Sequence, residues 1–311
     1  MANVTNKLRV DQRAALRAVG AATQWRLLLL WVGLLLISTA VASLPVWRAL
    51  SSLLDHSVHA AEWASHFDAL AFGDTLAALS PMSPALGAGA LLSVILSVLL
   101  SPFLNGMAVG SALAGRRLGF GHLLQCGVVE YPRMFRLLLW ALPLYAAAFA
   151  AVGAASALTE KFAARAVLES RADLVSDWAL AAVVVVFLIV QVVMASSRAA
   201  FMADPMLRSA TRAFGRGWLL LLRRPCSTLG WFVGISVVGY AVALALGLLR
   251  ISIPAGGAPA LVLGIVLMQS IALAMGWAHI ARMFALRAVA LSLPPRRKAR
   301  PAPSAPVPVA A

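Results

Sequence analysis

Four side chains in the stretch 53–70 have the types and spacing of a metal or acid–base site. They are two carboxylates and two imidazoles at intervals of four, three and four residues: Asp55, His59, Glu62 and His66. If the stretch is helical, all four fall within an arc of roughly 60° on one face. Carboxylates and imidazoles one helical turn apart can chelate a divalent metal, and neutral histidines suit zinc. A second chemical interpretation is a pH-sensing pair of histidines.

The remaining side chains of this stretch favour a structural interpretation. Its apolar residues form a second face of the same helix: Leu53, Leu54, Val58, Trp63, Phe67 and Leu70. A helix that lies in a membrane interface carries such a face together with a narrow polar stripe, and it needs no ligand. The chain also contains no phosphate-binding glycine loop, HExxH motif, nucleophile elbow or Cys-x-x-Cys pair. We therefore expect no enzyme activity, no bound metal and no cofactor.

The elements that would position these side chains are strongly apolar. Of the 311 residues, 62% are hydrophobic and 12% are charged, whereas a water-soluble domain carries about 25% charged residues. Six apolar runs are long enough to cross a bilayer, at 27–46, 86–110, 137–157, 178–197, 229–249 and 259–281. The sequence therefore predicts an all-α polytopic membrane protein whose six transmembrane helices form three hairpins.

The basic residues are distributed unevenly about the six runs. The formal net charge is +15, but the Lys and Arg residues lie beside apolar runs and not on a polar domain, so we expect no nucleic-acid partner. The two ends of the chain and the second and fourth connections hold 21 of the 26 basic residues. Because cytoplasmic segments carry the excess of Lys and Arg, we predict a bacterial cytoplasmic (inner) membrane protein with both termini cytoplasmic. The transmembrane domain is expected over 1–293, followed by a disordered, basic, Pro- and Ala-rich cytoplasmic tail at 294–311.

The segment 208–224 has the clearest amphipathic pattern in the chain. At 100° per residue its basic side chains share an arc of roughly 80°: Arg208, Arg212, Arg216 and Arg223. The opposite side carries apolar residues: Leu207, Phe214, Trp218 and Leu221. This pattern predicts a cytoplasmic surface helix that rests its apolar face on anionic lipid and ends before Pro225. A similar basic pattern at Arg13 and Arg17 suggests a unit of surface helix and hairpin that is repeated three times.

Three amide side chains lie within the predicted spans: Asn105, Gln191 and Gln269. Polar groups are costly in lipid, so these residues should face and bond to other helices, or line a solute pathway. Two GxxxG patterns, at Gly106 to Gly110 and at Gly230 to Gly234, allow close helix packing within one chain or in a homo- or hetero-oligomer.

Two stretches carry a resemblance to known proteins, namely Ala114 to Gly121 and Arg208 to Pro225. The chain resembles a loosely defined group of uncharacterised six-span bacterial inner-membrane proteins. It is also similar in outline to the membrane domain attached to some glycerophosphodiester phosphodiesterases. The resemblance implies a six-span fold over most of residues 10–290. It transfers neither the phosphodiesterase activity nor any functional residue, because the chain has no catalytic domain of that kind.

Together these features predict a non-enzymatic inner-membrane protein that engages anionic membrane lipid, or a partner, at the cytoplasmic face. The alternative is a permease for a small or lipid-like solute, which the intramembrane amides would serve.

Overall fold

The computed structural model describes residues 12–55, 57, 69–164, 169–253 and 257–292. Within these ranges the elements are helices and there is no strand, which confirms the all-α prediction. Six apolar helices are long enough to cross a membrane. They are α3 (Trp25–Leu54), α6 (Ser83–Ala114), α7 (Phe120–Ala163), α8 (Glu169–Ala203), α10 (Pro225–Ile251) and α11 (Gly257–Leu291). Each predicted span falls inside one of them, so the prediction of a multi-span membrane protein is confirmed.

Shorter elements connect or flank the long helices: α2 (Gln12–Ala21), α5 (Ala69–Leu79), the 3₁₀ helix η2 (Ser80–Met82) and α9 (Ala210–Arg223). The bounds of α9 follow from its flanking residues. Ser209 precedes it, and the Ser209 side-chain oxygen accepts a hydrogen bond of 3.4 Å from the backbone N–H of Arg212. Pro225 begins α10, so α9 ends where the sequence predicted.

The chain between the second and third spans differs from the predicted separate surface helix. Helix α7 begins at Phe120 and continues through Pro132 and Pro143 to Ala163. At 1.5 Å per residue its 44 residues extend over about 66 Å. This is roughly twice the ~30 Å thickness of a hydrocarbon core, so one helix contains both the basic segment and the span.

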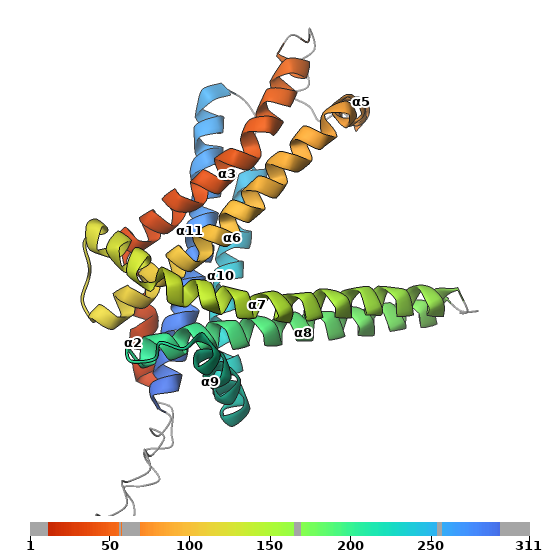
Figure 1. The fold of residues 1–311 in the computed structure, drawn as a ribbon. Helices are drawn as coiled ribbons and strands as arrows, with labels where there is room; N and C mark the ends of the chain where they lie inside the picture. The colour runs from red at the N-terminus through yellow and green to blue at the C-terminus, as the bar shows by residue number, and fades with distance from the viewer. Residues whose placement is uncertain (1–11, 56, 58–68, 165–168, 254–256, 293–311) are drawn as a thin grey trace, which may run out of the picture.

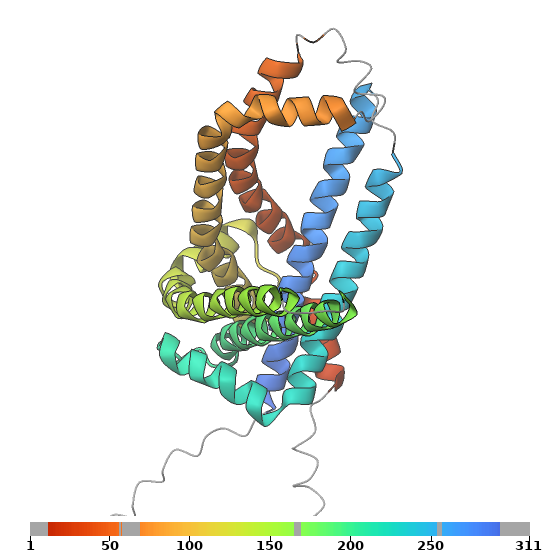
Figure 2. The ribbon, with the colours of Figure 1, turned by 90° about the vertical axis from the view of Figure 1, so that its right-hand side faces the viewer.

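The long helices pair in chain order, α3 with α6, α7 with α8, and α10 with α11. Figures 1 and 2 show that the first and third hairpins extend in similar directions, whereas the α7–α8 hairpin projects to the side. All three hairpins meet at one end of the molecule, where α2 and α9 also lie (Figure 1). We call this end the junction.

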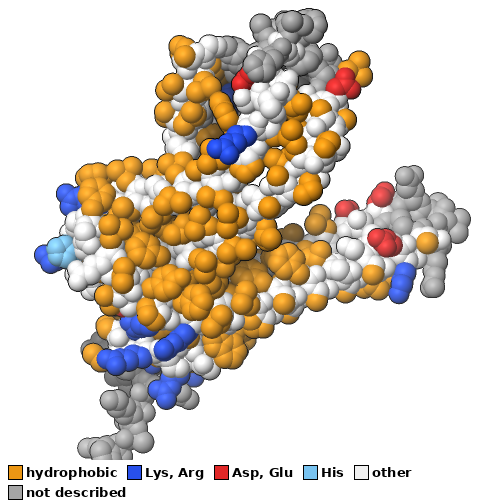
Figure 3. Space-filling view, turned by 45° about the horizontal axis from the view of Figure 1, so that its top comes forward, with side chains coloured by type: hydrophobic (Ala, Val, Ile, Leu, Met, Phe, Trp, Pro, Cys, Tyr) orange, Lys and Arg blue, Asp and Glu red, His pale blue; other side chains and the backbone are white. Residues whose placement is uncertain are grey.

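The buried core lies at the junction. Its largest side chains, which are at most 1% exposed, come from several helices: Leu27, Met107, Leu137, Met194, Phe201 and Met283. Away from the junction, the helices expose apolar side chains such as Leu91 on α6, Leu244 on α10 and Leu261 on α11. Figure 3 shows the apolar surface that results. Hydrocarbon tails would contact such a surface in a membrane, so its exposure fits helices that cross a bilayer.

The two GxxxG patterns have different surroundings. A Cβ atom added to Gly110 would lie 2.6 Å from Sγ of Cys126 on α7, so the first pattern packs α6 against α7 within the chain. A Cβ atom added to Gly230 or Gly234 would meet nothing within 4 Å. These two glycines line a cavity of about 440 Å³ between α2 and α10. An oligomer formed through this open face stays a prediction of the sequence.

Candidate functional site

The proposed metal ligands are described in part only. Asp55 follows the last residue of α3, and its carboxylate accepts a hydrogen bond from the Ser51 hydroxyl. His59, Glu62 and His66 lie outside the described residues. Among the residues that the structure describes, no group of three or more His, Cys, Asp or Glu side chains is placed to hold a metal. The expectation of no bound metal at these four positions therefore stays a prediction.

The four arginines of the amphipathic segment are all exposed: Arg208, Arg212, Arg216 and Arg223. They lie on or next to α9 at the junction, and Figure 3 shows Lys and Arg side chains gathered below the apolar surface. In the described part of the chain, Arg216 is the one of the four that forms an ion pair, through Nη1 to Oδ2 of Asp204 at 2.7 Å. The other three guanidinium groups can therefore meet an anionic surface.

The apolar side of α9 packs on the protein, which differs from the expected contact with lipid. Leu207 and Leu221 are buried, and Phe214 stacks on Trp140 of α7 with ring centroids 5.3 Å apart. Periodicity identified this side as apolar, but it does not distinguish lipid from a neighbouring helix as the contact. The apolar side chains that α9 still exposes are Leu219 and Leu222, which are 39% and 72% exposed.

A small residue allows α9 to approach α8 so closely. Gly217 is buried, and a Cβ atom placed on it would lie 2.8 Å from the carbonyl oxygen of Val193 and 2.9 Å from the backbone nitrogen of Ser197. Real Cβ atoms essentially never lie this close to other heavy atoms. Helix α9 is thus a fixed part of the junction, and its packing on α8 sets the side from which its arginines project.

The Asp204–Arg216 pair fixes the turn that precedes α9 and gives a prediction for pH. The hydrogen bond from Arg216, with a smaller contribution from the backbone N–H of Met206, lowers the pKa of Asp204 below its ordinary value of 3.8. A carboxyl group with a lowered folded-state pKa stabilises the fold above its unfolded pKa, and this stabilisation is lost as the pH falls through the folded-state pKa. Because both side chains are partly exposed, the pair contributes at most about 1 kcal/mol.

We expect Arg216→Gln to raise the pKa of Asp204 towards 3.8, since the largest cause of the shift is removed. Carboxyl-carbon NMR of the protein in detergent micelles, titrated between about pH 2 and 6, measures it. Arg212→Gln is the matched control, because this substitution removes the same charge from α9 and Arg212 is not a partner of Asp204. Identical titration curves for wild type and Arg216→Gln would contradict the pairing.

Asn105 belongs to a polar network that joins two helices. Its Nδ2 donates to the carbonyl of Ser101 at 2.7 Å, and its Oδ1 lies 3.0 Å from Nε2 of His279 on α11. The imidazole of His279 also packs on Trp31 of α3, with ring centroids 5.1 Å apart. Asn105 therefore faces another helix, as expected of a polar residue in a span.

The other two amides have different environments. Gln191 is exposed on α8 and Gln269 is half-buried on α11, so Asn105 is the buried one of the three amides. A basic residue that the sequence did not single out lies near the network. Arg282 donates through Nε to the carbonyl of Ala278 at 3.1 Å and through Nη1 to Oγ of Ser236 at 3.2 Å. The bond to Ser236 ties α11 to α10, whereas the bond to Ala278 lies within α11.

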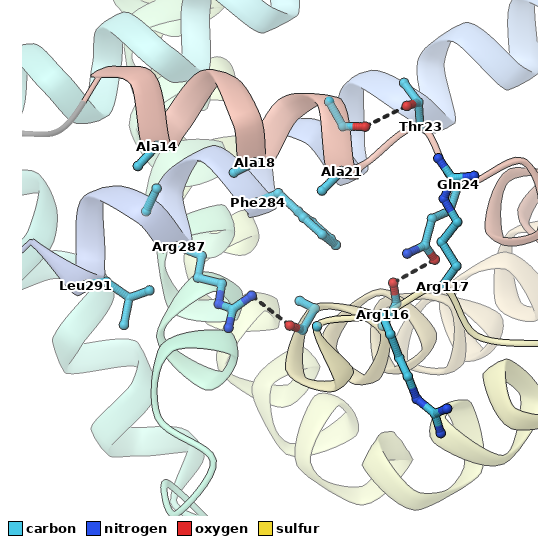
Figure 4. Close-up of a pocket in the computed structure, with 15 residues that line it drawn as sticks. Ala14, Ala18, Ala21, Thr23, Gln24, Arg116, Arg117, Phe284, Arg287 and Leu291 are labelled. Carbon is cyan, nitrogen blue, oxygen red and sulfur yellow. Dashed lines mark hydrogen bonds between the residues drawn. The ribbon is translucent and has the colours of Figure 1, made fainter.

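A cavity of about 460 Å³ opens at the junction between α2, the end of α6 and α11 (Figure 4). Three arginines line it, Arg116, Arg117 and Arg287, and the described lining residues include no carboxylate. Figure 4 shows Arg117 running beside Gln24, whereas Arg116 extends away from it. Sequence reasoning missed this cavity, because it had only counted these three arginines among the basic flanks of the spans.

Two hydrogen bonds fix the polar wall of this cavity. Arg287 donates through Nη1 to the carbonyl of Ala112 in the last turn of α6 at 2.7 Å. The Ser111 hydroxyl donates to Oε1 of Gln24 at 3.0 Å. Carbonyl groups at a helix C-terminus lack intrahelical partners, so the bond from Arg287 satisfies one of them.

Comparison of the chain with models of known protein families, with curated proteins and with solved structures gives no match. The resemblance to six-span inner-membrane proteins and to the membrane domain of certain phosphodiesterases therefore stays a prediction of the sequence.

Proposed function

We propose that this integral membrane protein lies in a bacterial cytoplasmic (inner) membrane with both termini cytoplasmic, and that it engages anionic lipid headgroups at its junction. The observation that carries the proposal is the exposed basic face of α9 at the end where the three hairpins meet: Arg208, Arg212, Arg216 and Arg223. The function needs no catalytic group, in keeping with the expectation of a non-enzymatic protein.

Simple electrostatics supports this role. A basic side chain near an anionic membrane surface contributes about 1 kcal/mol, and salt screens the attraction. Because α9 is packed on α8, its backbone is already ordered and presents these arginines along one side of the junction. Leu219 and Leu222 supply exposed apolar surface beside them, which can enter the layer between headgroups and acyl chains.

Protein reconstituted in nanodiscs tests the proposal, with spin-labelled phosphatidylglycerol and phosphatidylcholine as reporters of lipid at the protein surface. We expect wild type to prefer phosphatidylglycerol. In a variant with Arg208, Arg212, Arg216 and Arg223 all changed to Gln, the ratio of bound phosphatidylglycerol to bound phosphatidylcholine should fall at least about fivefold. Added salt should weaken the preference of wild type.

A second variant of equal charge controls for the overall change. It replaces four basic residues away from the junction: Arg48, Lys161, Arg171 and Arg250. The proposal predicts that this variant keeps the preference of wild type for phosphatidylglycerol. An equal loss in both variants, or no preference in wild type, would refute a specific role of the α9 face.

The sequence offered a permease as the alternative function. Asn105 is the most buried of the three intramembrane amides, and its side chain is already bonded to Ser101 and close to His279. Its polar groups are thus taken up by one bond within α6 and one contact with α11, and we base no transport proposal on it.

A further inference from the structure

The cavity between α2, α6 and α11 is distinct from the basic face of α9, since none of its described lining residues belongs to α9. Its volume of about 460 Å³ falls within the range of small-ligand sites, which is ~300–1,000 Å³. Its walls are of two kinds. One side carries guanidinium and amide groups, and the other is apolar, with Ala14 and Ala18 from α2 and Phe284 and Leu291 from α11.

Arg287 has unused hydrogen-bonding capacity at this cavity. Its Nη1 is bonded to the carbonyl of Ala112. Its Nη2 makes no hydrogen bond within the described residues, so it is the part of the guanidinium that can donate to an anion in the cavity. The bond to Ala112 also offsets the negative end of the α6 dipole, which would otherwise repel an anion.

The two remaining polar groups are suited to the same ligand. Arg117 is exposed and lies beside Gln24 in Figure 4, and no ion pair of Arg117 occurs among the described residues. Oε1 of Gln24 already accepts a hydrogen bond from Ser111, so the Nε2 amino group of Gln24 is the part that can donate to a ligand. Guanidinium groups form paired hydrogen bonds with phosphate oxygens, and these are stronger than bonds between neutral groups.

We propose that this cavity binds a phosphate ester, with Arg117, Arg287 and Gln24 donating to the phosphate oxygens and the apolar wall contacting the organic part. A phospholipid headgroup and a soluble phosphate ester share this chemistry. Binding of a lipid headgroup rests on the proposed function, in which the junction lies in the headgroup layer. Binding of a soluble phosphate ester does not depend on the proposed function.

Binding to detergent-solubilised full-length protein, prepared without phosphate, tests the proposal. Isothermal titration calorimetry would use two probes, glycerol 3-phosphate and short-chain dihexanoyl phosphatidylglycerol below its critical micelle concentration. We expect at least one probe to bind wild type and to bind Arg117→Gln about tenfold more weakly, because one charge-assisted bond is lost. Arg117 makes no described structural bond, so thermal unfolding should show that the variant is folded. Arg48→Gln, which removes an equal charge from an exposed site on α3, should bind like wild type.

A second variant fills the space without changing the charge. Ala18→Leu adds three carbon atoms to the α2 wall of the cavity and should lower the affinity for the probe that binds wild type. Binding of the lipid alone identifies a headgroup as the ligand, and binding of both probes identifies the phosphate ester as sufficient. No binding of either probe, or equal binding to wild type and Arg117→Gln, overturns the proposal.

The two lipid hypotheses can fail separately. If the α9 variant loses its preference in nanodiscs while Arg117→Gln binds both probes as wild type does, the cavity proposal falls and the proposed function stands. If wild type shows no lipid preference but binds glycerol 3-phosphate in an Arg117-dependent way, the proposed function falls and the cavity proposal stands.

Discussion

Replacement of Gly217 by alanine is expected to lower the thermal stability of the protein strongly and to loosen α9 from α8. The new methyl group would lie 2.8 Å from the carbonyl oxygen of Val193 and 2.9 Å from the backbone nitrogen of Ser197. Both atoms belong to the backbone of α8, so no side-chain rotation can relieve the clash. Overpacking of a core costs about 1–3 kcal/mol, and we expect the upper part of that range because the backbone must move.

Gly215 provides a matched control on the same helix. It is exposed, and a Cβ atom placed there meets nothing within 4 Å. Alanine is favoured over glycine inside a helix by about 1 kcal/mol, so Gly215→Ala should leave the unfolding temperature unchanged or raise it. Thermal unfolding in detergent, followed by tryptophan fluorescence, compares the two variants. Equal unfolding temperatures for both would show that α9 does not pack on α8 through Gly217.

Replacement of Gly110 by alanine should destabilise the contact between α6 and α7. The added methyl group would overlap Cβ of Cys126 and lie 2.6 Å from its Sγ. We expect a loss of about 1–3 kcal/mol in the free energy of unfolding, since the two helices must separate. Gly234→Ala is the control, because Gly234 belongs to the other GxxxG pattern and has open space around it.

A compensating change makes this prediction sharper. Cys126→Gly removes the atoms that the new methyl group would meet, so the double variant should be more stable than the sum of the two single variants predicts. Denaturant unfolding of the four proteins gives the coupling free energy, which for residues in contact is about 0.5–3 kcal/mol. A coupling of zero would mean that Gly110 and Cys126 do not touch.

The six helices and the end of α9 were predicted because their signals are local. An apolar run of about 20 residues is sufficient to identify a span. Ser209 and Pro225 mark the ends of α9 because one side chain can accept from the first turn and the other residue cannot continue a helix. The extension of α7 back to Phe120 was not predicted, since its basic residues suggested a connection.

Contacts between distant segments could not be predicted from the same signals. The two GxxxG patterns are equivalent in sequence, yet one packs against Cys126 and the other faces open space. The cavity has walls from both ends of the chain, and the bond from Arg287 to Ala112 joins residues 175 positions apart. Such pairs depend on how the hairpins meet, which hydrophobic periodicity does not specify.

The sideways course of the α7–α8 hairpin bears on how the chain enters a bilayer. In Figures 1 and 2 the α7–α8 hairpin runs across the directions of the other two hairpins. If the α3–α6 and α10–α11 hairpins stood along the bilayer normal, the α7–α8 hairpin would lie within the hydrocarbon layer. Glu160, Lys161 and Asp173 are exposed near the tip of this hairpin, and charged groups in hydrocarbon are costly. A membrane that all six helices cross together therefore requires a smaller angle between this hairpin and the other two than the one in Figures 1 and 2.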